Sequence, residues 1–195
     1  LRLASLGYFG HMWELYAMWA WFAAFAADRF TERSYSDPTQ AAALAAFAVI
    51  GVGAVGSWLG GMVADRWGRT LSTIGAMAAS GSMAAVIGFL TDAPTWLLGV
   101  LSLVWGLTVV ADSAQFSAMV TELADQRYVG TAVTVQLAVG FSLTVLTIFL
   151  VPVLRDGPGW GPAFAVLAVG PVVGLVAMVR LRSSPLAAQL AGGRG

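Results

Sequence analysis

The sequence contains no cysteine and no lysine, and charged residues make up only 10% of its 195 positions. Without cysteine the chain has no disulfide, no thiolate metal ligand and no thiol nucleophile. A soluble domain carries about 25% charged residues, so a chain this poor in charge cannot cover a surface that faces water. Ten arginines balance ten acids, which leaves no basic field for nucleic acid. The composition, 58% hydrophobic, therefore predicts a chain solvated by a lipid bilayer.

Signatures of catalysis and of resident metals are also missing. His11 is the single histidine, which excludes the zinc-binding HExxH motif, and the sequence has no G-x-S-G motif for a serine nucleophile. We therefore expect neither an intramembrane enzyme nor a metal site or a cofactor.

Six long apolar segments approach the roughly 20 residues that a helix needs to cross the hydrocarbon core. Short polar or glycine- and proline-rich stretches separate them. We predict an all-α membrane protein with transmembrane helices over residues 3–27, 41–63, 71–90, 96–120, 130–154 and 163–179. Residues 1–181 would form one transmembrane domain, and residues 182–195 a polar cytoplasmic tail.

The placement of arginine predicts the orientation. If the first helix starts inside, the inner segments hold Arg2, Arg66, Arg69, Arg127, Arg180, Arg182 and Arg194. The outer segments hold Arg29, Arg33 and Arg155. The positive-inside rule then places both termini in the cytoplasm of a multi-pass protein of the cell (inner) membrane. Four tryptophans near predicted helix ends are typical of interfacial anchors: Trp58, Trp67, Trp96 and Trp160.

A loop with glycine, acid and arginine at fixed offsets joins the second and third predicted helices. It contains Gly61, Asp65, Arg66, Gly68 and Arg69. A tight turn needs the backbone freedom of glycine, and an aspartate can accept hydrogen bonds at a neighbouring helix N-terminus. The segment closely resembles the signature loop of the major facilitator superfamily, G-x-x-x-[DE]-[RK]-x-G-x-[RK]-[RK]. It departs from that pattern at the basic end, where Arg69 directly follows Gly68.

This resemblance covers the whole chain as half of a transporter. In that family twelve helices form two six-helix halves, each built from two inverted three-helix repeats. The chain resembles the second, C-terminal half, so its partner would be a missing N-terminal half or a second copy of itself. In either arrangement Asp65 would meet the start of a fifth helix in the opposite half, such as the one that begins near Gly130.

Few ionisable side chains lie within the predicted helices. A charge at the bilayer centre costs about 2.5–3.5 kcal/mol on insertion scales, so such groups face protein or water. The first helix carries His11 and Glu14, and the fourth carries Asp112 and Gln115, each set along one helical stripe. Counting from the inner helix ends, His11 lies at a depth of about 13 Å and Asp112 at about 15 Å. The family resemblance implies that these two helices line the central path.

We predict that Glu14 and Asp112 bind a proton or the solute in a water-filled cavity, with His11 tuning or relaying the proton. Gln115 and Gln136 are further candidates. The same groups could instead form a buried polar set that locks helices together. Because the sequence offers no basic residue for the cavity, a carried anion would need arginine from the missing half.

The predicted function is a secondary active transporter of a small solute, coupled to protons and working by alternating access. The alternative is a non-transporting membrane assembly or sensor subunit with the same fold.

Overall fold

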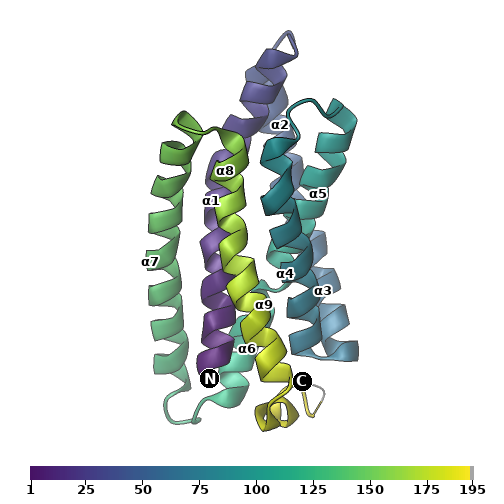
Figure 1. Cartoon of the computed structure of the whole chain (residues 1–195). Coiled ribbons are helices and arrows are strands. Elements are labelled where there is room, and N and C mark those ends of the chain that lie inside the picture. Colours follow the sequence, from purple (N-terminus) through teal and green to yellow (C-terminus); the bar gives the residue numbers. More distant parts are fainter. Residues whose placement is uncertain (194–195) are drawn as a thin grey trace.

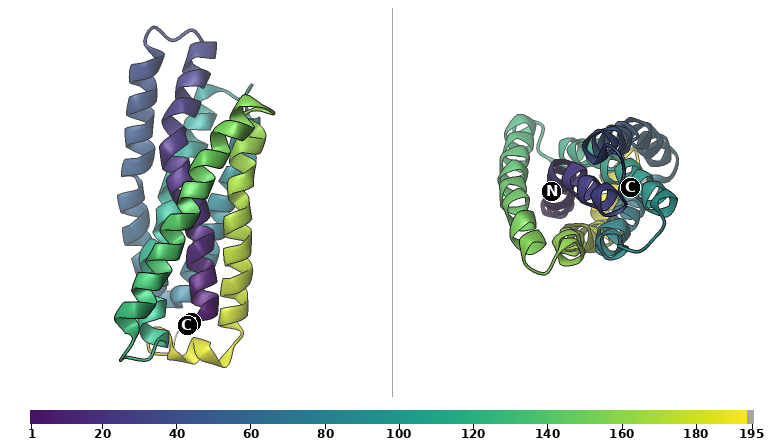
Figure 2. Two further views of the ribbon diagram at one scale, coloured as in Figure 1. Left: turned by 90° about the vertical axis from the view of Figure 1, so that its left-hand side faces the viewer. Right: turned by 90° about the horizontal axis from the view of Figure 1, so that it is seen from above.

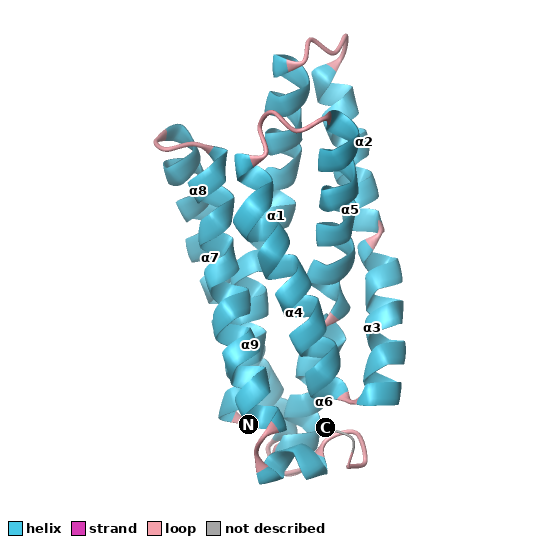
Figure 3. Ribbon diagram, turned by 45° about the vertical axis from the view of Figure 1, so that its right-hand side comes forward, coloured by secondary structure: helices cyan, strands magenta, loops and turns pink. Residues whose placement is uncertain are grey.

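The computed structural model describes residues 1–193, and this part of the chain is a bundle of long helices joined by short loops (Figures 1 and 3). The helices are α1 (Arg2–Glu32), α2 (Pro38–Gly51), α3 (Gly53–Trp67), α4 (Arg69–Val86), α5 (Thr95–Ala111), α6 (Ser113–Leu123), α7 (Val129–Asp156), α8 (Trp160–Ala165) and α9 (Val169–Arg182). Short 3-10 helices are η1 (Ile87–Phe89), η2 (Val166–Ala168) and η3 (Pro185–Gln189).

Each predicted span corresponds to one helix or to consecutive helices that continue one another. Within the described chain, five of these stretches are long and apolar enough to cross a membrane: Pro38–Trp67, Arg69–Phe89, Thr95–Leu123, Val129–Asp156 and Trp160–Arg182. The remaining span, α1, has 31 residues but a more polar composition that includes histidine, glutamate and several tryptophans. It can carry these groups because it packs against α2, α7 and α9 inside the bundle (Figure 2).

The chain order divides into two groups of three spans. The first group is α1, α2–α3 and α4, and the second is α5–α6, α7 and α8–α9. α1 leads away from the end of the bundle where both termini lie, whereas α5 leads back toward it, so the groups start from opposite ends (Figure 1). Arg194, counted above among the inner arginines, lies outside the described residues.

Three spans that the sequence predicts as continuous are interrupted. The second breaks at Val52, between α2 and α3, and the fourth at Asp112, between α5 and α6. The sixth passes through η2 before α9 begins. At Asp112 the carbonyl accepts a hydrogen bond from the Gln115 N–H at 3.0 Å, the shorter i→i+3 connection of a 3-10 turn. The break therefore lies at one of the few acids inside a span.

Glycines bring α3 and α5 into close contact beside this break. A Cβ at Gly56 would overlap the carbonyl oxygen of Leu107, and one at Gly60 would overlap that of Ala111. In lipid, where no hydrophobic effect drives helices together, such close backbone approach is a main source of helix association. The glycine pair thus holds α3 against the end of α5.

The four tryptophans predicted as interfacial anchors do not all lie at the surface. Trp58, Trp67 and Trp96 are exposed, as interfacial anchors would be. The prediction for Trp160 is wrong, because its indole is buried and donates a hydrogen bond of 2.9 Å to Oδ2 of Asp28. The ring also packs against Phe25 and Phe164.

The segment that follows α9 folds back under the bundle. After η3, Leu190 is fully buried and the N–H of Ala191 donates to Oε2 of Glu122 at 3.2 Å. The division into a domain over residues 1–181 and a cytoplasmic tail over residues 182–195 stays a prediction.

Candidate transport site

The polar stripe predicted on α1 meets α5 and α4 inside the bundle. Nδ1 of His11 lies 2.9 Å from Oδ1 of Asp112, at the α5–α6 break. One turn further along α1, Oε1 of Glu14 accepts a hydrogen bond from the indole N–H of Trp105 at 2.7 Å, and Oε2 accepts one from the Ser80 hydroxyl at 2.9 Å. Three polar contacts at neighbouring depths therefore join α1 to α4 and α5.

The depth estimate from the sequence agrees with this arrangement for His11 and Asp112, which are in contact. Glu14 bonds instead to Trp105 and Ser80. Trp105 lies seven residues before Asp112, on the same helical stripe of the fourth span, whereas Ser80 was not predicted. Its only signal was a serine beside a glycine in the third span, which is also typical of ordinary helix packing.

The expectation that these groups face an aqueous gap is wrong for this conformation. The side chains of His11, Glu14 and Asp112 are each about 2% exposed, even though no second half covers the bundle. The physical reason is that α1 is surrounded by helices of its own half, so its polar stripe points inward. The polar set is sealed within one six-helix unit.

Several buried polar atoms of this region lack a hydrogen-bond partner among the described residues. They are Nε2 of His11, Oδ1 of Asp112, and both amide atoms of Gln136 on α7. Oδ1 of Asp112 is close to His11, yet their contact does not have hydrogen-bond alignment. Such atoms are rare in folded proteins, because each leaves a desolvation cost uncompensated. They are the groups best placed to take a proton, a water or a polar solute atom.

Gln115 lies in a different cluster from the one predicted. Its Oε1 accepts a hydrogen bond of 2.9 Å from Arg69, at the start of α4. Arg69 also forms a forked pair with Glu122 near the end of α6, with Nη2 and Oε1 2.7 Å apart. Together with the Ala191 N–H on Glu122, these contacts tie the signature loop, α6 and the chain after α9 into one network.

The signature loop has the backbone that its glycine predicts. Gly68 has a φ of 97° between α3 and α4, a region that other residues rarely adopt. Asp65 and Arg66 are exposed on the last turn of α3, and the Arg66 guanidinium carbon lies 5.5 Å from the Trp67 ring centre. A Cβ at Gly61 would meet no atom of the described chain within 4 Å, so this glycine is not required for packing inside the half.

The described residues contain no group of three or more histidine, cysteine or acidic side chains that could hold a metal ion.

Comparisons with known proteins bear on the fold. No family model matches the sequence. An uncharacterized MFS-type transporter of Bacillus subtilis (strain 168), YfnC, is 28% identical over 127 residues, which are 65% of this chain and 30% of that protein. A solved structure titled as the selectivity mechanism of a bacterial homologue of the human drug peptide transporters PepT1 and PepT2 matches with a TM-score of 0.65 at 21% identity.

That match covers 98% of this chain and 42% of the solved chain, so the present sequence spans less than half of either relative. The structural similarity extends over nearly the whole described chain. The prediction from the sequence is therefore confirmed: the chain has the all-α, six-helix fold of half a major facilitator superfamily transporter.

Proposed function

We propose that the chain is one half of a secondary active transporter that carries a small solute by alternating access and couples the movement to protons. Its long apolar helices suit a multi-pass protein of the cell (inner) membrane with both termini in the cytoplasm. Both relatives are named as transporters, which supports transport but says nothing of the solute carried here. The fold and these relatives give no support to an enzymatic role.

The observation that carries the proposal is the environment of Glu14. Its carboxylate is enclosed within the spans and receives hydrogen bonds from two neutral donors, Trp105 and Ser80. Among the described residues no arginine pairs with it. A buried carboxylate without a counter-ion is costly when charged, and binding a proton removes that cost. Glu14 is accordingly the proposed proton carrier, with His11 and Asp112 as the adjoining pair that relays the proton.

The moving part is the broken helix that bears Asp112. Discontinuous helices near the bilayer midplane are a recurring feature of secondary transporters, because their free backbone groups and termini can bind ions and solutes. α5 ends beside Asp112, and Gly56 and Gly60 pack α3 directly on that end. A proton that changes the charge of the His11–Asp112 pair would act on this joint between α5 and α6.

The transporter needs a second six-helix unit, either a separate half or a second copy of this chain. α7 begins at Val129 without a side-chain cap in the described chain, and a Cβ at Gly130 would meet no described atom within 4 Å. Its open N-terminus favours an acid by its dipole. The Asp65 equivalent of the opposing unit is the proposed partner, and Asp65 here would reach the matching helix across the interface.

One observation favours the alternative, a non-transporting assembly or sensor subunit. The polar set is sealed in this conformation, as a purely structural lock between helices would be. The two functions differ in whether Glu14 exchanges protons.

The test uses the full-length protein that carries this chain, reconstituted in liposomes with an internal pH dye. Imposed gradients of candidate solutes should drive proton flux in the parent. Glu14→Gln and Asp112→Asn should abolish that flux while insertion and thermal stability are retained. Asp156→Asn, which removes an exposed acid at the end of α7, is the matched control and should behave as the parent. Undiminished flux in both core variants would overturn the proton coupling, and absence of any solute-driven flux in the parent would favour the alternative.

A further inference from the structure

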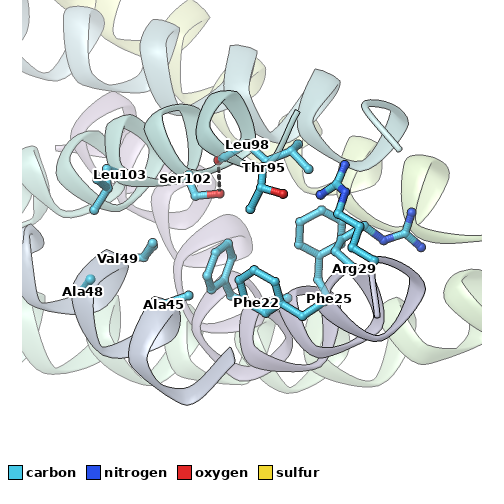
Figure 4. Close-up of a pocket in the computed structure, with 14 residues that line it drawn as sticks. Phe22, Phe25, Arg29, Ala45, Ala48, Val49, Thr95, Leu98, Ser102 and Leu103 are labelled. Carbon is cyan, nitrogen blue, oxygen red and sulfur yellow. Dashed lines mark hydrogen bonds between the residues drawn. The ribbon is translucent and has the colours of Figure 1, made fainter. Parts of the chain in front are cut away.

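A pocket distinct from the Glu14 network opens toward the end of the bundle opposite the termini. It lies between α1, α2 and α5 and has a volume of about 180 Å³ (Figure 4). Phe22, Phe25 and Leu98 form much of its apolar wall, and Arg29 and Arg33 also line it. The sequence predicts these arginines in an outer segment. In the structure Arg29 lies in the last turn of α1 and Arg33 directly follows the end of that helix, so both line the pocket.

The two arginines differ in how their charges are balanced. Nη2 of Arg29 pairs with Glu32 at 2.6 Å. Arg33 donates hydrogen bonds to the carbonyl oxygens of Thr91 and Ala93, and no carboxylate among residues 1–193 forms an ion pair with it. Nε of Arg29 and Nη1 of Arg33 are buried without a hydrogen-bond partner in the same part of the chain. The pocket therefore has one unbalanced positive charge, and each of its two arginines has an unused donor nitrogen.

The size and lining of the pocket define a ligand class. An engineered apolar cavity of about 150 Å³ binds benzene, so a pocket of this volume accommodates one ring. Phe22 and Phe25 offer aromatic surface to such a ring (Figure 4). Arginine donors suit a carboxylate, whose two oxygens can accept both unused N–H groups. One net charge in the pocket matches a monoanion.

We propose that this pocket binds a small monocarboxylate with a ring-sized apolar body, of the kind represented by benzoate, with its carboxylate on Arg29 and Arg33 and its ring against Phe22 and Phe25. The binding itself does not depend on transport. Under the proposed function, which this part rests on, the pocket is an outer station for the solute. Phe22 lies two helical turns from Glu14, about 12 Å along α1.

Gly99 provides the sharpest test, because it lines the pocket and a Cβ placed there would meet no described atom within 4 Å. Gly99→Leu should fill the pocket without disturbing its walls. Gly75→Leu is the matched control, since Gly75 on α4 has the same open surroundings and lies outside the pocket. Arg33→Gln removes the unbalanced charge, but it also releases the Thr91 and Ala93 carbonyls. The glycine pair therefore decides the question even if the arginine variant folds poorly.

The experiment measures benzoate binding to the purified full-length protein in detergent by titration calorimetry, with benzyl alcohol and inorganic phosphate as the neutral and the non-aromatic comparison ligands. Benzoate should bind saturably and the comparison ligands at least tenfold more weakly, since a charged hydrogen bond contributes a tenfold or greater share of affinity. Gly99→Leu should abolish benzoate binding, Arg33→Gln should weaken it at least tenfold, and Gly75→Leu should leave it unchanged.

Four outcomes would overturn the proposal: no benzoate binding by the parent, equal binding of benzyl alcohol, equal binding of phosphate, or unchanged benzoate binding in Gly99→Leu. Mass spectrometry of the purified protein provides a further outcome. A bound phospholipid that Gly99→Leu releases would identify the pocket as a lipid site instead. These measurements report binding alone. A failure to bind benzoate would therefore leave the proton-coupling result on Glu14→Gln untouched, and a failure of the proton-flux prediction would leave the binding result untouched.

Discussion

The contact of Gly60 with α5 can be tested by adding a side chain at that position. A Cβ there overlaps the carbonyl oxygen of Ala111, and backbone cannot rotate away as a flexible side chain would. In Gly60→Val, α3 and α5 must separate until the new atoms reach ordinary van der Waals distance. Overpacking of a close contact costs about 1–3 kcal/mol, and the separation also weakens the Cα–H···O contacts of the crossing, about 0.5–1 kcal/mol each. We expect a total loss of about 2–4 kcal/mol.

For a chain of this size that loss corresponds to a fall in melting temperature of about 5–15 °C. Heating the detergent-solubilised protein while recording tryptophan fluorescence measures it, because the chain has eight tryptophans. Gly61→Val is the matched control: it adds the same side chain one residue later, where a Cβ meets no described atom within 4 Å. Equal melting temperatures for the two variants would refute the packing argument. Since Ala111 directly precedes Asp112, Gly60→Val should also reduce proton flux more than Gly61→Val does.

Three further predictions concern the buried polar and apolar contacts. Glu14→Ala leaves the indole N–H and the serine hydroxyl without their acceptor and should cost about 2–5 kcal/mol of stability, measured by thermal unfolding. Glu14→Gln keeps an acceptor and should cost less than about 1 kcal/mol. Similar losses in the two variants would contradict the hydrogen-bonding scheme. Arg69→Gln should lower the stability by about 1–3 kcal/mol because it breaks a partly buried forked pair, whereas Arg127→Gln, at a fully exposed pair, should leave the stability unchanged. Leu190→Ala should cost about 2–4 kcal/mol and Leu186→Ala, a partly exposed position, under about 1 kcal/mol, both measured by fluorescence melting.

The number and order of the spans were predictable because the lipid acts on every residue of a helix at once. Each span needs an uninterrupted apolar run, and such a run is visible without knowing which helices are neighbours. The contact between His11 and Asp112 was accessible for a similar reason. Depth in the membrane follows from counting residues along a helix of fixed rise, so two polar groups at equal depth are candidates to meet.

The direction in which the stripe faces was not predictable. An amphipathic stripe has the same sequence pattern whether it faces water or the polar groups of neighbouring helices. Only the packing of α1 among α2, α7 and α9 decides between these two surroundings. Of the helix breaks, the one at Val52 has a local signal, because Gly51 and Gly53 flank it, whereas the one at Asp112 has no neighbouring glycine or proline. The pocket beside Arg29 and Arg33 was not predictable either, because the apolar pattern of α1 ends before its backbone does. The helix continues to Glu32, and Arg33 directly follows it.

Under the proposed function, the enclosure of the polar set restricts how alternating access would work. Glu14 joins α1 to α4 and α5, and His11 joins α1 to the α5–α6 break, so separating these helices would expose four or more buried polar groups. A six-helix unit held in this way moves most easily as one body, rocking against its partner half. The local change is then confined to the joint at Asp112, where α5 ends and glycines of α3 give the backbone close support. Protonation would act as a switch on that joint, and the rigid unit would convert the local change into movement at the interface.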